Sequence, residues 1–237
     1  TGNTEGVIEL LREIGLKPTN GKYKSLLELN EKEMSKLITS VMLRNPKAKN
    51  KEIIGDIFLI KLFNKLEDAR ELSTIINACS RLGESETAIK YCMELPPSKK
   101  RAKSIHTKYK QFIISGLKYV NESEKIQGKG FIIINAKNQI KDTIIGTIAS
   151  ILSNSSIYDQ GTIITTMAYY DDKIKVSSRI VGEDQRNVRE ILNEIINEIG
   201  GEVGGHKRAA GCMIKQDKEQ EFIDLLKRNS EIKTIKI

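Results

Sequence analysis

The hydrophobic pattern of the chain changes near Gly130, and this change restricts the folds that the chain can adopt. Before that residue, apolar side chains recur mainly at helical spacing, as in residues 4–14. After it comes a continuous apolar run, residues 131–135 (FIIIN), that suits a buried strand. Residues 162–170 and 173–181 are β-rich runs on either side of a short polar turn, which predicts a hairpin. The pattern predicts an α/β chain in which a helical region precedes a mixed β-sheet domain with helices.

Five helices are expected before the proline pair at 96–97, over residues 4–14, 31–43, 50–64, 66–82 and 84–94. The spacing of Asn30 and Glu33 is typical of a capping arrangement at the start of the second helix. Beyond the prolines, residues 98–127 predict one long helix that links two domains. Its first part carries cations and no acid, which indicates either a solvated helix face or a stripe that follows a phosphate backbone. These cations are Lys99, Lys100, Arg101, Lys103, Lys108 and Lys110.

The second half of the chain alternates strands and helices. Further helices are expected over 142–152, 185–199 and 219–228, and further strands over 212–214 and 232–237. Gly200 follows the helix that ends at Ile199, and with Gly201 it reads most simply as a helix cap and turn. We therefore expect three regions, namely helical residues 1–97, a linker helix over 98–128, and an α/β domain over 129–237.

The charge balance and the cysteines limit the class of protein. Lys and Arg number 39 against 31 Asp and Glu, and the net charge of +8 favours a polyanionic partner such as nucleic acid. No apolar run is long enough to span a membrane, and residues 1–6 lack the features of a secretory signal peptide. Cys79, Cys92 and Cys212 are widely spaced and form no CxxC pair, which is typical of reduced thiols in a cytoplasmic protein.

Residues 204–211 (GGHKRAAG) carry the clearest chemical signal. Two adjacent glycines allow positive φ and a close approach of another molecule to the backbone. Three consecutive donors follow, and the small residues after them leave room for a ligand. A buried loop would also favour small residues, but it has no use for three donors. The pattern predicts a phosphate cradle formed by Gly204, Gly205, His206, Lys207, Arg208, Ala209 and Gly211.

These residues match the GGHxxAAG signature of the DHH-associated domain. The chain therefore resembles the C-terminal part of DHH-family phosphoesterases, in particular the archaeal RecJ-like exonucleases, in which this loop contacts a phosphate or the terminal nucleotide. Residues 177–179 (Ser-Ser-Arg) resemble the Ser-x-Arg or Ser-Arg element of that domain, which implies that Ser178 and Arg179 grip phosphate. The structural alternative is a serine that packs across strands and an arginine at a solvated edge.

A second resemblance lies at the end of the helix expected over 66–82. The run from Asp68 to Gly83 (DAREL…INACSRLG) is similar to a segment of archaeal RecJ-like proteins that faces the substrate cleft. Asn77 and Arg81 stand four residues apart and so share one helix face. The resemblance implies that both line the cleft, although Ser80 stands where the family usually has Gly. A capped helix end with a surface cation is the structural alternative.

The resembled enzymes bind two divalent ions, Mn²⁺ or Mg²⁺, through clustered Asp and His side chains. This chain has only His106 and His206, far apart in sequence, and no Asp-x-Asp pair. It also does not begin with Met. We therefore expect no catalytic residue and no metal ligand in it, and we expect the metal-binding amino-terminal half of the protein to be absent from this sequence.

The resemblance implies that the intact protein is a RecJ-like hydrolase, an exonuclease on single-stranded DNA or RNA in replication or repair, and that this chain grips the substrate. It also implies that the helical residues 22–65 dock replisome proteins such as GINS, with core packing as the alternative for the apolar run 53–63. Two other classes stay open. One is a non-catalytic replisome scaffold of the same superfamily. The other is a nano-RNA or cyclic-dinucleotide phosphodiesterase or the tail of an alanyl-tRNA synthetase, which the INACSRLG segment and the helical first third disfavour.

Overall fold

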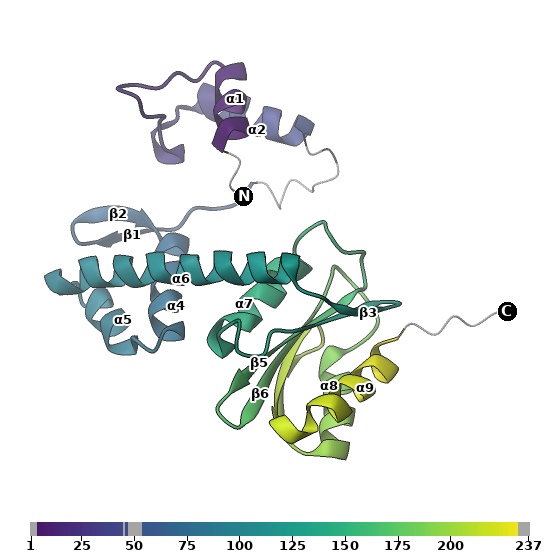
Figure 1. Ribbon diagram of the computed structural model, residues 1–237. Helices are drawn as coiled ribbons and strands as arrows, with labels where there is room; N and C mark the ends of the chain where they lie inside the picture. The colour runs from purple at the N-terminus through teal and green to yellow at the C-terminus, as the bar shows by residue number, and fades with distance from the viewer. Residues whose placement is uncertain (1–3, 45, 47–53, 232–237) are drawn as a thin grey trace. The chain divides into compact units, whose positions relative to one another are not determined.

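The computed structural model describes residues 4–44, 46 and 54–231, and the chain divides after Ile60 into two compact units. Figure 1 shows the elements of both units. The first unit contains α1 (Thr4–Glu13), a short 3-10 helix η1 (Leu26–Glu28) and α2 (Glu31–Arg44). The division falls inside the region 1–97 that the sequence pattern groups together.

Two expectations concern the first unit. The capping arrangement at α2 is confirmed, because Oδ1 of Asn30 accepts from the backbone N–H of Glu33 at 2.9 Å and Oε2 of Glu33 accepts from the backbone N–H of Asn30 at 3.0 Å. The helix over residues 50–64 is wrong where the structure describes it. Residues 54–58 have no regular secondary structure and a strand begins at Leu59, since a short apolar run does not distinguish a helix from a strand. Residues 50–53 lie outside the described part.

A two-stranded sheet precedes the next helices. It consists of β1 (Leu59–Leu62) and β2 (Lys65–Asp68). The helix α4 (Ala69–Arg81) begins later than the predicted residue 66, because Asp68 is its N-cap and accepts from the backbone N–H of Arg70 at 2.8 Å.

Two more helices complete this part of the second unit. They are α5 (Ser85–Cys92) and α6 (Pro96–Glu122). α6 begins at the proline pair rather than after it. Backbone N–H groups in the first turn of a helix have no partner within the helix, so proline, which lacks this group, is tolerated there. The three helices bury one apolar cluster, which includes Leu72, Ile75, Cys79, Tyr91, Ala102 and Ile105.

The predicted α/β class is confirmed by a six-stranded mixed sheet in the order β3-β4-β5-β6-β8-β7. Its strands are β3 (Ile126–Gly128), β4 (Phe131–Asn135), β5 (Ile163–Tyr170), β6 (Lys173–Ile180), β7 (Glu202–His206) and β8 (Ala209–Lys215). β4 and β5 are parallel, and the other neighbours are antiparallel. The sequence pattern missed β3 and β7, and the strand expected over 232–237 lies outside the described residues.

Helices cover both faces of this sheet (Figure 1). One face packs against α7 (Asp142–Ser153), and the other packs against α8 (Val188–Ile199) and α9 (Glu219–Ser230). In β4, Phe131 and Ile133 join the cluster of α8 and α9, whereas Ile132 and Ile134 join the cluster of α7. The apolar run of β4 is therefore buried on both faces, as its continuity predicts.

Arg186 lies between β6 and α8 and ties three segments together. Its Nη1 donates to the carbonyl oxygens of Gly130 (3.2 Å) and Ser230 (3.0 Å), and its Nη2 donates to the carbonyl oxygen of Gly161. Its Nε also donates to Oδ1 of Asp184 at 3.0 Å. No signal in the sequence distinguishes this arginine from the many others at the surface.

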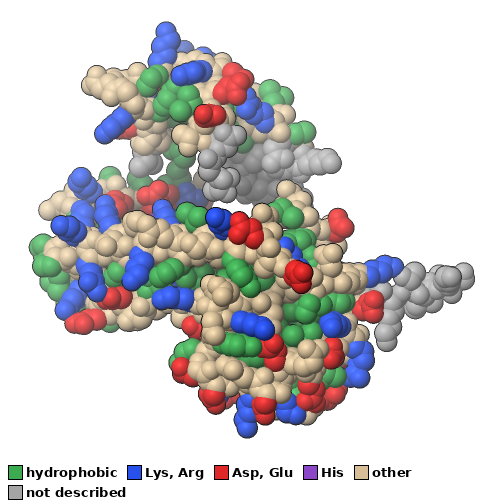
Figure 2. All heavy atoms as spheres, in the orientation of Figure 1, with side chains coloured by type: hydrophobic (Ala, Val, Ile, Leu, Met, Phe, Trp, Pro, Cys, Tyr) green, Lys and Arg blue, Asp and Glu red, His purple; other side chains and the backbone are tan. Residues whose placement is uncertain are grey.

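Cations gather along α6 and its neighbours, where Figure 2 shows Lys and Arg side chains in blue. Three members of the predicted stripe have partners. Arg101 pairs with Glu84 (2.6 Å). Nζ of Lys99 lies 4.6 Å from the ring centroid of Phe63, and Nζ of Lys108 lies 5.9 Å from that of Phe112. Among the described residues, neither α6 nor any other helix is long and apolar enough to cross a membrane.

Candidate functional site

Three adjacent strands bring most of the predicted site residues into register. Arg179 of β6 lies opposite Ala209 of β8, which lies opposite His206 of β7. Side chains two residues apart on a strand face the same way. The next row on this face therefore consists of Ser177, Gly211 and Gly204. The glycine-rich motif is a β-hairpin rather than an open loop, and its first and last residues share one face of the sheet with Arg179.

This face is the one that α7 covers over β5 and β6. Gly146 of α7 lies directly above the row, because a β-carbon there would be 3.4 Å from Oγ of Ser177 and 3.8 Å from Nη2 of Arg179. Ser150, one turn further along α7, accepts a hydrogen bond from Nε of Arg179 at 3.1 Å. The absence of a side chain at Gly146 therefore makes room for the guanidinium group beside the helix.

The guanidinium group of Arg179 is fixed by three hydrogen bonds. Besides the bond to Ser150, Nη1 donates to the carbonyl oxygens of Ser178 (2.8 Å) and Ala210 (3.3 Å). All of these acceptors are neutral. Arg179 is half-buried, and among the described residues no carboxylate lies within ion-pair distance of it. The charge of this arginine is thus positioned but not neutralised.

A second arginine lies close to the first. Burial, followed by the charge of Arg81, lowers the pKa of Arg179. Arg81 ends α4, and its Nη1 donates to the carbonyl oxygen of Thr143 in the first turn of α7 at 3.0 Å. Within the described residues Arg81 also has no carboxylate partner. Two guanidinium groups that repel each other and lack a counterion form a site that an anion would stabilise.

The glycines of the motif differ in the structural reason for which a side chain is excluded. Gly205 has φ of +126°, and a β-carbon there would lie 2.4 Å from the carbonyl oxygen of Ala209. A β-carbon on Gly211 would lie 2.7 Å from the carbonyl oxygen of Val176, so this glycine permits the close approach of β8 to β6. Gly204 has no neighbouring atom within 4 Å of such a carbon. Only Gly204 therefore leaves open space above the face of Arg179.

Alanine substitutions are expected to separate these two kinds of glycine. Gly205→Ala should lower the free energy of unfolding by about 2 kcal/mol or more, since it combines backbone strain with a steric clash. Gly204→Ala is the matched control and should change it by less than about 0.5 kcal/mol. Chemical denaturation of both variants checks this, and equal stabilities would contradict the backbone geometry of the hairpin.

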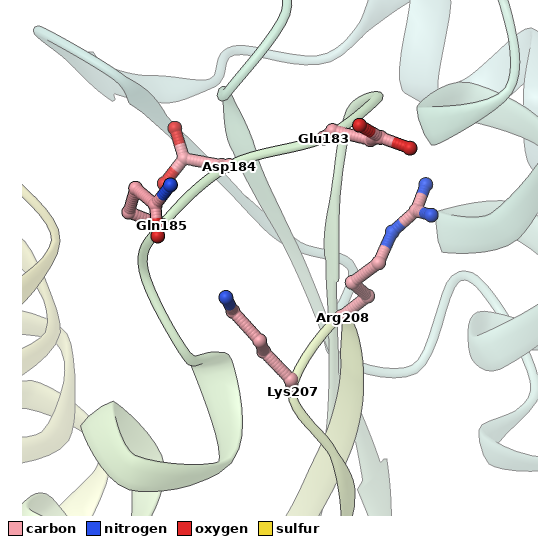
Figure 3. A pocket seen from close by; sticks show the side chains of 5 residues that line it. All are labelled: Glu183, Asp184, Gln185, Lys207 and Arg208. Atoms are coloured by element: carbon pink, nitrogen blue, oxygen red, sulfur yellow. The ribbon is translucent and has the colours of Figure 1, made fainter.

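The turn residues of the hairpin face a pocket of mixed charge. Lys207 and Arg208 line it together with Glu183, Asp184 and Gln185, and Figure 3 shows Arg208 extending toward Glu183. The turn itself is anchored at two points of the backbone. The carbonyl oxygen of Lys207 accepts from N–H of Val188 (2.9 Å), and that of Arg208 accepts from N–H of Ile180 (3.1 Å). Both predicted cations are thus exposed, but each has acidic neighbours.

Ser178 does not belong to this face. It is 1% exposed and its hydroxyl lies 2.8 Å from Oγ1 of Thr165, on the side of the sheet that packs against α8 and α9. A ligand above Arg179 cannot reach it, and Ser177 has the orientation that the resemblance implied for Ser178. Asn77 is exposed on α4, and its side-chain amide lies 3.4 Å from Oγ of Ser73.

Sequence reasoning missed the contribution of α7 to the site. Gly146, Ser150 and Thr143 contact the two arginines, yet small and hydroxyl residues in a helix carry no signal of their own. No three His, Cys, Asp or Glu side chains among the described residues lie close enough to hold a metal ion. These residues therefore do not fit a metal centre, and we derive no metal-dependent step from them.

Comparisons with known proteins show which domains and folds this chain is similar to. Residues 128–231 match the DHHA1 domain. An uncharacterized protein of Methanocaldococcus jannaschii is 30% identical over 94% of this chain and 46% of its own length. The structure of RecJ from Thermus thermophilus in complex with Mg²⁺ has a TM-score of 0.55 at 16% identity, over 85% of this chain and 31% of RecJ. That of CDC45 from Entamoeba histolytica has a TM-score of 0.53 at 8% identity, over 95% of this chain and 50% of CDC45.

At 16% and 8% identity, the similarity of this chain to RecJ and CDC45 shows that it shares their fold. The chain spans half the length or less of each of these relatives. The match to the DHHA1 domain covers strands β4 to β8 with α7, α8 and α9, and so includes the strands that carry Arg179 and the glycine-rich hairpin. The comparisons therefore show a match to the DHHA1 domain over residues 128–231 and a fold shared with RecJ and CDC45 over most of this chain.

Proposed function

We propose that this chain is the substrate-binding part of a RecJ-like exonuclease that hydrolyses phosphodiester bonds of single-stranded DNA or RNA in replication or repair. The observation that carries the proposal is the pair Arg81 and Arg179, which lies beside the open face of the hairpin without a carboxylate partner among the described residues. Phosphodiester oxygens are anions that guanidinium groups bind well, through charge-assisted hydrogen bonds.

Each residue has a distinct part in this proposal. Arg179 is held rigidly by Ser150 and two backbone carbonyls, so that its remaining nitrogen points a fixed donor at one phosphate. Arg81 approaches the same phosphate from α4. His206 lies in the row of Arg179 at the exposed end of β7 and donates a further hydrogen bond. Gly204 lies on the same face in the next row and leaves it open beside His206.

The chemistry of hydrolysis belongs to other residues in this proposal. Mn²⁺ or Mg²⁺ would activate water and stabilise the leaving oxygen. We propose that its ligands lie in a part of the whole protein outside this sequence, and that this chain binds and orients the strand without cleaving it. The exposed residues of the helical region would then serve contacts with replisome proteins such as GINS.

The proposal is tested by exchanging one exposed arginine of α4 for glutamine. Arg81→Gln should weaken binding of a fluorescent oligothymidylate by roughly tenfold, because a charge-assisted hydrogen bond contributes about 1.5 kcal/mol. The matched control is Arg70→Gln on the same helix, where the arginine already pairs with Asp68 at 2.8 Å. Fluorescence anisotropy gives both affinities. Equal affinities of the two variants, or no binding by the unmodified chain, would overturn the proposal.

A second candidate is a non-catalytic scaffold of the same superfamily. It is supported by the likeness to CDC45 from Entamoeba histolytica, which extends over 95% of this chain. Both candidates use the same phosphate-binding face, but only the exonuclease releases nucleotides. A nuclease assay on the whole protein with Mn²⁺ and labelled single-stranded DNA separates them, since the scaffold binds the strand and leaves it intact.

A further inference from the structure

A groove continues from Arg81 away from the hairpin. It lies between the end of α4, the middle of α6 and the start of α7. The residues that matter in its lining are Arg81, Lys108, Phe112, Lys141, Asp142 and Thr143. None of the last five has a role in the phosphate site described above, apart from the carbonyl group of Thr143 that holds Arg81.

The groove is strongly cationic. Two ammonium groups face one aromatic ring, because Nζ of Lys141 lies 4.5 Å and Nζ of Lys108 lies 5.9 Å from the ring centroid of Phe112. Within the described residues neither lysine has a carboxylate at ion-pair distance. The single acid of the groove, Asp142, is engaged by Lys175 at 3.3 Å. With Arg81, three cations in this described part of the chain therefore remain without a counterion.

Phe112 explains why the two lysines stay in the groove. A lysine side chain is flexible and strongly hydrated, and alone it would extend into water. The ring attracts both ammonium groups by cation–π interaction, so their charges are held over the same short stretch of surface. Phe112 is half-buried and also packs against the cluster of α7, which fixes the ring itself.

Arg81 joins this groove to the Arg179 site. It lines the groove, and its charge is close enough to Arg179 to lower the pKa of that residue. The cations thus form one continuous track from Arg179 through Arg81 to Lys141 and Lys108, and His206 lies in the row of Arg179 at the start of this track. A small monoanion could occupy only one point of such a track, whereas a chain with a negative charge at every link matches its whole length.

We propose that the groove of Arg81, Lys108, Phe112 and Lys141 is a second phosphate-binding site for the same single strand of nucleic acid. This inference rests on the function proposed above and gives the path of the strand, which runs from the hairpin across the start of α7 to α6. Lys108 and Lys141 each contact one phosphate of the strand, some links away from the phosphate at Arg179, and Phe112 is a positioning residue for both lysines.

The salt dependence of binding tests this path in the intact chain. In the double variant Lys108→Gln/Lys141→Gln, the slope of log affinity against log salt for a long oligothymidylate should fall by about 1.4, since each phosphate contact contributes about 0.7 for single strands. At about 0.1 M salt this corresponds to a loss of affinity on the order of 25-fold. A thymidine dinucleotide with a terminal phosphate reaches only the Arg179 site and should bind both proteins equally.

The control variant is Lys90→Gln/Lys227→Gln. It also removes two lysine charges, but from α5 and α9, and it should leave the slope unchanged. The second site would be overturned, and the Arg179 site left intact, if the slope of the double variant equals that of the unmodified chain. An equal fall of the slope in the control variant would overturn it too. Failure of the proposed function looks different, because the Arg81→Gln and Arg70→Gln variants would then bind the oligothymidylate equally. Phe112→Leu keeps an apolar side chain, and it should reduce the slope by less than the double variant does.

Discussion

Replacing Arg179 by methionine is expected to weaken binding of single-stranded DNA about 100-fold, because the phosphate then loses charge-assisted hydrogen bonds of about 2.7 kcal/mol in total. The same substitution should leave the free energy of unfolding unchanged or raise it. The guanidinium group is half-buried beside Arg81, and burial with that neighbouring charge lowers its pKa, so the folded state does not favour the charge. Methionine keeps the length and the apolar packing of the side chain.

Two measurements check this prediction together. Fluorescence anisotropy gives the affinity, and urea denaturation gives the stability. Arg189→Met is the control, since the side chain of Arg189 is exposed on α8, which packs on the opposite face of the sheet. An ordinary hydrogen bond contributes about 1 kcal/mol. If Arg179→Met lowers the free energy of unfolding by more than this, the residue serves the fold, and its assignment to a phosphate-binding site is contradicted.

Replacing Arg186 by alanine is expected to lower the free energy of unfolding by about 3 kcal/mol, which is typical when one partner of a partly buried charge network is removed. The side chain joins Gly130 at the start of β4 to Ser230 at the end of α9 and also holds Asp184. No other described side chain makes these connections. Arg189→Ala on the nearby surface of α8 should stay within about 0.5 kcal/mol of the unmodified protein.

The effect of Arg186→Ala should depend on pH. Burial acts to raise the pKa of Asp184, but the hydrogen bonds and charge of Arg186, with Lys207, outweigh it, so the pKa is lowered. A lowered carboxyl pKa contributes stability above the unfolded-state pKa of about 3.9, and this contribution is lost as the pH falls through the folded-state value. The difference in the free energy of unfolding between the unmodified protein and Arg186→Ala should therefore shrink at acidic pH. A difference that stays constant down to about pH 2 would contradict the role of Asp184.

Long periodic patterns predicted the helices and strands well. The helix expected over 142–152 is Asp142–Ser153, and the β-rich runs became β5 and β6 with boundaries shifted by one residue. The elements that the sequence pattern missed or misplaced have physical explanations. Strand β7 was missed because its glycines supply no side chains from which a period of two can be seen. The start of α4 was placed too early because Asp68 is equally compatible with a helix interior and with a cap.

The candidate site was predictable only in its strand residues. The motif from Gly204 to Gly211 and Arg179 were found because they are unusual in sequence, and the register of β6, β8 and β7 then places Arg179 and His206 in one row. The choice of Ser178 was wrong for this face because the resemblance was followed without the phase of the strand, in which Ser178 shares one face with the apolar Val176 and Ile180. The closeness of Arg81 to Arg179 depends on how α4 packs beside α7, and local sequence contains no trace of such a contact.

The three hydrogen bonds that hold the guanidinium group of Arg179 have a consequence for selectivity. Ordering a long, mobile side chain on complex formation ordinarily costs about 0.5–1.5 kcal/mol in entropy, and here most of that ordering precedes the arrival of any partner. Such a donor cannot swing toward a misplaced charge. In the function proposed above, it would select a phosphate group that arrives at one fixed position and orientation.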